Sequence, residues 1–131
     1  MKEQKVFAME NATKFDVSSL KYNEAGLVPC IAQDHKSGEI LMMAWMNAES
    51  IEKTLETGEV TYWSRSRQAF WVKGKTSGHV QHLVDFRVDC DRDALLALVT
   101  QKGPACHTNR RSCFYTAVRA GDEVELMKPM V

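Results

Sequence analysis

The chain has 131 residues, 44% of them apolar and 26% charged, which suits one globular domain with its own core. Seventeen basic and seventeen acidic side chains give a formal net charge of zero, which argues against binding of DNA or RNA by bulk electrostatics. The N-terminal residues lack the apolar run of a signal peptide, and no stretch approaches the roughly 20 apolar residues that span a bilayer. We therefore expect a cytoplasmic protein with no nucleic-acid or membrane partner.

The first part of the chain predicts a lead-in followed by a β-hairpin. Residues 1–18 show no clear periodicity and have room for a short helix. The segments LVPCIAQD (27–34) and ILMMAWM (40–46) read as strands, because the turn-forming KSGE (36–39) lies between them. Within the first strand, Cys30 is expected to be a small buried apolar side chain.

The segment NAESIEKTLETGE (47–59) predicts a helix. Asn47 can accept a hydrogen bond from the first turn, and Gly58 can end the helix in a left-handed conformation. Ile51 and Leu55 lie four residues apart, so they give the helix a narrow apolar stripe.

The middle of the chain, residues 60–101, predicts several strands and one loop. VTYWSRS (60–66) is β-branched and aromatic and predicts a strand, and AFWVKGKTSGH (69–79) passes from an apolar run into a loop. VQHLVDFRVD (80–89) alternates like a strand with one wet face. ALLALVTQ (94–101) fits either a buried strand or two turns of helix, which Asp93 could cap.

The C-terminal part predicts a loop, a last strand and a polar tail. Gly103 and Pro104 interrupt any regular ladder, so KGPACHTNRR (102–111) is expected to be a loop. SCFYTAVRA (112–120) predicts a strand, and residues 119–131 form the tail. We expect a single α+β domain over 1–131, with a mostly antiparallel or mixed β-sheet and one or two helices.

Three aspartates stand at alternate positions in DCDRD (89–93). If the preceding strand continues through this segment, Asp89, Asp91 and Asp93 share one face and Cys90 points to the other. Oxygen donors of this kind select Mg²⁺ or Ca²⁺, but the glycine and glutamate that an EF-hand requires further along are absent. Magnesium bound by carboxylates and substrate oxygens, and a solvated acidic turn capped by Asp93, both remain open.

Three cysteines outside the first strand form a second candidate set: Cys90, Cys106 and Cys113. In a reducing compartment, three thiolates with no obvious fourth ligand suit a catalytic zinc that keeps one position for water. Buried free thiols are the alternative. His107 fits a ligand, a proton shuttle or a loop histidine. The H-x-E and P-C-x-x-C signature of zinc deaminases is absent, which excludes that class.

Taken together, the motifs resemble the phosphoribosyl-AMP cyclohydrolase family, which catalyses the third step of histidine biosynthesis. The resemblance runs from about residue 20 to residue 118 and rests on LMMAWMN (41–47), TGEVTYWSRSR (57–67), WVKGKTSGHVQ (71–81), DCDRD (89–93) and GPACHTNRRSCFY (103–115).

The resemblance implies two metals and a second subunit. It assigns Mg²⁺ to Asp89, Asp91 and Asp93, and Zn²⁺ to Cys90, Cys106 and Cys113. In the family, the counterpart of Cys90 serves a site completed by the partner subunit, so an obligate homodimer with a shared zinc site is implied. The chain leaves no room for the pyrophosphohydrolase domain that many members carry, so the single-function form is expected.

The implied reaction is hydrolysis of the N1–C6 bond of an adenine nucleotide that carries a phosphoribosyl group on N1. Zinc would lower the pKa of a bound water to about 7 for attack at C6, and His107 would move protons. A different metal-dependent amidohydrolase and a non-catalytic zinc-stabilised module are the rival interpretations.

The two phosphates of such a substrate need positive charge and hydrogen-bond donors. Candidates are Arg65 and Arg67, expected on one strand face, and Lys73, Thr76 and Ser77, in a loop able to form an anion-binding nest. For each arginine alone, a solvated surface charge is the alternative.

Two tryptophans and two loop residues within the family motifs have uncertain roles or depart from the family pattern. Trp63 and Trp71 fit core positions better than base-stacking platforms. Lys75 stands where glutamate is common in the family, and Asn109 stands where glycine is usual; asparagine tolerates the left-handed conformation that such a glycine can adopt.

Overall fold

The computed structural model describes residues 12–130, so most of the predicted lead-in lies outside the described residues. In chain order the elements are the 3₁₀ helix η1 (Val17–Ser19), β1 (Val28–Asp34), β2 (Ile40–Met46), α2 (Ala48–Thr57), β3 (Thr61–Ser64), β4 (Ala69–Val72), β5 (Gln81–Val88), β6 (Leu95–Gln101), β7 (Thr116–Arg119) and β8 (Asp122–Glu125). No helix within residues 12–130 is long and apolar enough to cross a membrane.

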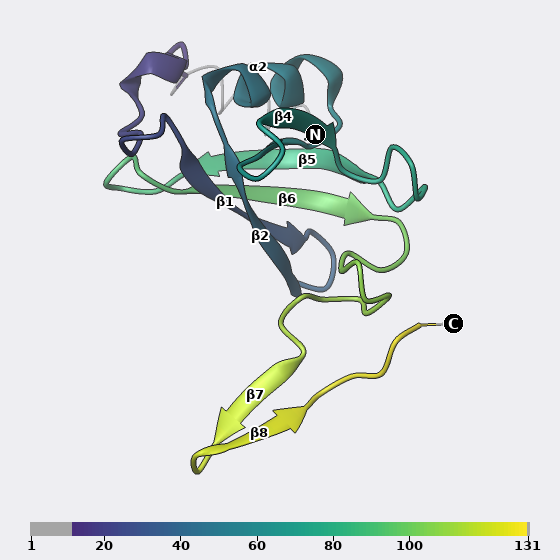
Figure 1. The fold of residues 1–131 in the computed structure, drawn as a ribbon. Helices are drawn as coiled ribbons and strands as arrows, with labels where there is room; N and C mark the ends of the chain where they lie inside the picture. Colours follow the sequence, from purple (N-terminus) through teal and green to yellow (C-terminus); the bar gives the residue numbers. More distant parts are fainter. Residues whose placement is uncertain (1–11, 131) are drawn as a thin grey trace.

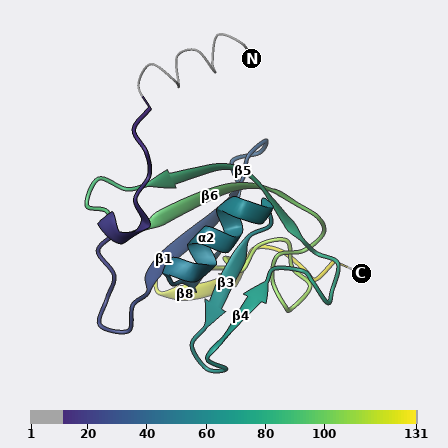
Figure 2. The ribbon, with the colours of Figure 1, turned by 90° about the horizontal axis from the view of Figure 1, so that it is seen from above.

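A four-stranded sheet in the order β2-β1-β6-β5 forms the centre of the domain (Figure 1). The β1–β2 and β5–β6 pairs are antiparallel and the β1–β6 pair is parallel. Helix α2 lies across one face of this sheet, with the β3–β4 hairpin beside it (Figure 2). The predicted α+β class with a mixed sheet is confirmed, while the dimer remains a prediction.

The core lies between the sheet and α2. Its fully buried members include Ile51 from the helix, Tyr62 from β3, and Cys30, Ala97 and Val99 from the two central strands. Burying these side chains removes apolar surface from water at about 25 cal/mol per Å², which is the main force holding α2 onto the sheet. Cys30 is the small buried side chain that the sequence predicted.

Helix α2 begins and ends as predicted. Asn47 Oδ1 accepts from Ser50 N at 2.8 Å, the Ser50 hydroxyl caps Asn47 in return, and Gly58 ends the helix at φ 75°. The predicted apolar stripe is wrong at Leu55, which is 44% exposed. Thr54 takes its place on the buried face, because its hydroxyl accepts from Thr61 N at 2.9 Å and ties the helix to β3.

Two predicted strands differ in detail. In β5 the pairing register shifts between Leu83 and Asp85, so the inward face passes from Gln81 and Leu83 to Phe86, and strict alternation is broken. The segment 94–101 is the strand β6, so Asp93 caps no helix.

The predicted last strand and polar tail are corrected by the hairpin β7–β8. Strand β7 covers only Thr116–Arg119, and the tail folds back as β8. Ala120 and Gly121 both have positive φ, 51° and 85°, which gives the tight two-residue turn that a hairpin needs. This hairpin projects away from the central sheet (Figure 1).

Candidate active-site cavity and metal sites

A cavity of about 390 Å³ lies where the β4–β5 loop meets the loop between β6 and β7. The β4–β5 loop contributes Lys73, Ser77 and His79, and the second loop contributes Cys106, His107 and Cys113. This volume falls in the range of sites for small ligands. Of the predicted residues, the structure therefore brings together two cysteines, His107, Lys73 and Ser77.

The loop carrying Cys106 is closed by its own backbone. Ala105 N donates to Arg111 O, and Cys106 N donates to Arg110 O, both at 3.1 Å. Asn109 N donates back to Cys106 O at 3.0 Å, and Asn109 has φ 67°. Asparagine is among the non-glycine residues that accept this left-handed conformation, as expected from the sequence.

The side chain of Arg111 fastens this loop to the sheet. Its guanidinium donates to the carbonyls of Gln101 at 3.1 Å and Gly103 at 2.9 Å. It also pairs with Asp34 at 3.1 Å and Glu39 at 3.3 Å, at the end of the β1–β2 hairpin. The guanidinium thus holds the loop through hydrogen bonds to two neutral carbonyls and ion pairs with two carboxylates.

The two cysteines of the cavity affect each other's ionisation. Burial alone would raise the pKa of Cys106, but hydrogen bonds from Thr108, whose hydroxyl donates to the sulfur at 3.0 Å, and from Cys113 outweigh it and lower the pKa. Cys113 lies exposed at the cavity rim, yet partial burial first, and then the negative charge of Cys106, raise its pKa to about 11. The two pKa values therefore shift in opposite directions, because each sulfur acts on the other.

Lys73 is electrostatically linked to the same thiols. Partial burial lowers the pKa of its ammonium group, while Cys113 and Cys106 act in the opposite direction. A half-buried cation beside two ionisable thiols makes the cavity attractive to anions.

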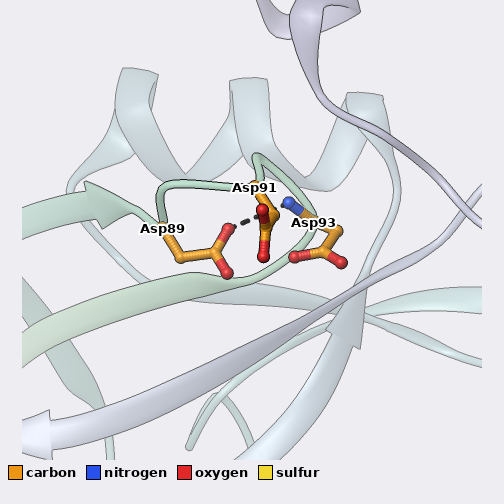
Figure 3. A group of neighbouring side chains, drawn as sticks. All are labelled: Asp89, Asp91 and Asp93. Atoms are coloured by element: carbon orange, nitrogen blue, oxygen red, sulfur yellow. Dashed lines mark hydrogen bonds between the residues drawn. The ribbon is translucent and has the colours of Figure 1, made fainter.

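The aspartates lie close together, but not on a strand. Strand β5 ends at Val88 and does not continue through this segment, which forms a turn in which Arg92 has φ 62°. Carboxylate oxygens of Asp89, Asp91 and Asp93 all lie within 4.8 Å of one another (Figure 3). The turn brings them together because Asp89 Oδ1 accepts from Asp93 N at 3.0 Å.

This crowding changes the proton affinity of the cluster. The hydrogen bond with Asp89 raises the pKa of Asp93, with burial and the charges of Asp89 and Asp91 acting in the same direction. The pKa of Asp89 is lowered, because the slight burial that would raise it is outweighed by hydrogen bonds from the backbone of Asp93 and Ala94. Like charges held this close favour a cation between them.

Cys90 does not join the cavity cysteines within one chain. It is exposed on the aspartate turn and does not line the cavity of Cys106 and Cys113. Within residues 12–130, the aspartates are the one group of three or more potential metal ligands that the fold gathers. All four cysteines are free thiols.

Arg65 and Arg67 were expected on one face of a strand, but they lie in the turn that follows it, because β3 ends at Ser64. Both arginines line a second, more open cavity of about 620 Å³, where Arg65 stacks over Trp45 at 5.0 Å from the ring centroid. Thr76 lines neither this cavity nor the one with the cysteines, but a third that it shares with Lys75.

Three cavity residues were missed by sequence reasoning: Met42, Trp71 and His79. Trp71 is only half-buried and borders both the cysteine cavity and the arginine cavity, so it is not a plain core residue. Trp63 is half-buried too and packs edge-on against Phe70 at 5.0 Å. Both tryptophans lie in a short amphipathic hairpin, and this pattern in the sequence could have indicated that they border a cavity.

Known proteins match almost the whole chain. The family model for phosphoribosyl-AMP cyclohydrolase matches residues 42–115. A relative named phosphoribosyl-AMP cyclohydrolase from Ruegeria sp. strain TM1040 is 76% identical over 127 residues, which cover 97% of this chain and 98% of the relative. Relatives of the same name from Ruegeria pomeroyi and Paracoccus denitrificans are 74% and 72% identical, over 89% and 88% of this chain and 98% and 95% of their own lengths. The chain therefore belongs to the phosphoribosyl-AMP cyclohydrolase family of enzymes, as its motifs predicted.

Proposed function

We propose that this enzyme opens the purine ring of 1-(5-phosphoribosyl)-AMP by hydrolysis of the N1–C6 bond, the third step of histidine biosynthesis. The observation that carries the proposal is the pair Cys106 and Cys113, which share a cavity of nucleotide-binding size with Lys73 and His107. The family membership and the names of the relatives support the same reaction.

Zinc fits the donor set of the cavity. Zn²⁺ prefers thiolates, and Cys106 and Cys113 place two sulfurs in one cavity. Two thiolates from one chain are too few, so Cys90 of a second copy would complete the set. Zinc held there would supply Lewis acidity, lowering the pKa of a coordinated water to about 7.

The reaction adds one water across the N1–C6 bond. The water oxygen bonds to C6, the C6–N1 bond breaks, and N1 keeps the electron pair and takes up a proton. His107 lines the cavity beside Cys106 and would accept the proton that the attacking water loses. His107→Ala should therefore lower kcat by about 10²- to 10⁴-fold while zinc stays bound.

Magnesium is proposed at Asp89, Asp91 and Asp93. Their clustered oxygens match the hard ligands that Mg²⁺ prefers, and a cation there would neutralise the charge that the three carboxylates gather. These carboxylates lie on the same turn as Cys90, so binding there would also order the turn that presents the third thiol.

Positive charge for the substrate phosphates is proposed from two sources. Lys73 and Ser77 lie in the cysteine cavity, and Arg65 and Arg67 lie in the adjoining cavity across Trp71. Thr76 borders a different cavity, and so it would act on the substrate only through the loop that holds Ser77.

A homodimer with shared sites is proposed because Cys90 lies outside the cavity of Cys106 and Cys113, and complementation tests it. Cys90→Ser and Cys106→Ser each remove one thiol of every shared site, so each pure variant should be inactive. If copies exchange freely, mixing them should restore roughly a quarter of wild-type activity, since half of the dimers then hold one intact site of two. Two inactive variants that stay inactive after mixing and confirmed exchange would contradict the shared site.

The reaction itself is tested by following the ultraviolet change on ring opening of phosphoribosyl-AMP. We expect turnover by the zinc- and magnesium-loaded protein. A chelator should abolish this turnover, and Cys106→Ser should lose both its zinc and its activity. Cys30→Ala is the matched control, because Cys30 is buried in the core away from the cavity. A fully metallated protein that leaves the substrate intact would refute the proposal.

A further inference from the structure

A second histidine, His79, lines the cavity beside Cys106 and His107. It ends the β4–β5 loop, whose Lys73 and Ser77 face the same cavity, so three side chains able to donate hydrogen bonds come from one loop. His79 is half-buried, and within residues 12–130 its ring nitrogens make no hydrogen bond to protein groups.

The ring of His79 rests on a residue without a side chain. A Cβ added at Gly103 would lie 2.8 Å from Cδ2 and 3.3 Å from Nε2 of His79, so any larger residue there would displace the ring. Gly103 also has φ +71°, a conformation that other residues adopt at a cost. The loop that carries Cys106 thus provides the surface on which His79 lies.

The backbone of His79 is fixed by a chain of buried amide groups. Gln101 Nε2 donates to His79 O at 3.1 Å, and Gln101 Oε1 accepts from Gln81 Nε2 at 2.8 Å. Gln81 Oε1 in turn accepts from the Tyr62 hydroxyl at 2.8 Å, and both Gln81 and Tyr62 are fully buried. Glutamine side chains are costly in a core unless every group is paired, and here the network is complete.

We propose that His79 is a further substrate-contacting residue, whose imidazole donates a hydrogen bond to a phosphate or ribose oxygen of the phosphorylated nucleotide. Its ring is placed before substrate arrives, by Gly103 beneath it and Gln101 behind its carbonyl. A donor fixed in this way loses little freedom on binding, so the contact strengthens affinity. The inference rests on the proposed function, since it places that substrate in this cavity.

The first test removes the imidazole. His79→Ala should raise KM by about 3- to 10-fold if the acceptor is a neutral ribose oxygen, and by about 10- to 100-fold if it is a charged phosphate oxygen. The kcat should stay within about twofold and the zinc content should be unchanged. His79→Asn keeps a donor near the same place and should recover most of the KM. His82→Ala is the control, because His82 is exposed on β5 three residues further on.

The second test displaces the ring without removing it. Gly103→Ala should raise KM as His79→Ala does. The KM of the double variant should be no higher than that of the more impaired single variant, because both substitutions remove the same contact. Gly26→Ala is the matched control: Gly26 has φ +76° with nothing within 4 Å of an added Cβ, so it carries the backbone strain without the collision. Thermal unfolding confirms that each variant is folded.

Calorimetric binding of adenosine 5′-monophosphate separates this inference from the proposed reaction. If wild-type protein leaves phosphoribosyl-AMP intact but binds the monophosphate, and His79→Ala weakens that binding by about threefold or more, the reaction is wrong and the His79 contact stands. If His79→Ala binds and turns over as wild type does, or if Gly103→Ala and His79→Ala add independently, the inference is overturned. A wild type that neither turns over phosphoribosyl-AMP nor binds the monophosphate overturns both.

Discussion

Replacing Arg111 by methionine should destabilise the domain by about 3–4 kcal/mol. The guanidinium donates to two carbonyls, at Gln101 and Gly103, and pairs with Asp34 and Glu39. Each carbonyl bond is worth about 1 kcal/mol, and the two carboxylate contacts together add about 1–2 kcal/mol after solvent screening. The screening is partial, because the Arg111 side chain is 29% exposed and that of Asp34 12%.

The effect should depend on pH through Asp34. Backbone donation from Ser37 holds the pKa of Asp34 below its ordinary value of 3.8, and Arg111 contributes to the same shift against the effect of burial. A carboxyl whose pKa is lowered on folding stabilises the protein above its unfolded pKa, and that contribution disappears as pH falls through the folded pKa. The stability gap between wild type and Arg111→Met should therefore be widest near pH 7 and shrink below about pH 4.

Urea unfolding at pH 7 and at pH 3.5 measures both effects, with Arg87→Met as the control. Arg87 pairs with Asp85 on the surface, where the side chains are 62% and 52% exposed, so its loss should cost less than about 0.5 kcal/mol. If Arg111→Met costs no more than Arg87→Met, the loop is not held by its guanidinium. A gap that stays constant from pH 7 to pH 3.5 would exclude the contribution of Asp34.

Three further predictions concern the aspartate turn, the cysteines and the buried network. Asp91→Asn should raise the Mg²⁺ concentration needed for half-maximal activity about tenfold or more, measured by titration of activity with the metal. Iodoacetamide at pH 8.5 should leave Cys30 intact until the protein unfolds, as measured by mass spectrometry, since Cys30 is buried and burial raises its pKa to about 12. Tyr62→Phe should cost about 1–3 kcal/mol in urea unfolding, because it leaves the buried Gln81 oxygen unpaired.

Local patterns in the sequence were enough to predict the first half of the fold. The cap at Asn47, the stop at Gly58 and the hairpin around 36–39 depend on neighbouring residues, so the sequence carries them directly. The parallel pairing of β1 with β6 was not predictable, because it joins residues about 65 apart through tertiary packing. The turn Ala120–Gly121 was missed because alanine at positive φ is an uncommon hairpin signal.

The site was predicted as a set of residue types and not as a geometry. The motifs pointed to Cys106 and Cys113, and the structure places both in one cavity. The aspartates were expected on a strand face but meet in a turn, because the Asp89 carboxylate bonds the following backbone instead of pointing along a ladder. His79 was missed because its position depends on Gly103, twenty-four residues away in a different loop.

The place of β6 in the sheet sets the order in which the chain can assemble. It is the last strand of the central sheet to be synthesised, yet it lies between β1 and β5 and bonds to both. As long as the residues of β6, up to Gln101, remain inside the ribosome, the edges of β1 and β5 that β6 will join are unpaired. The sheet is complete only after β6 has emerged, so the nascent chain is most vulnerable to edge-to-edge aggregation after β5 has emerged and before β6 pairs.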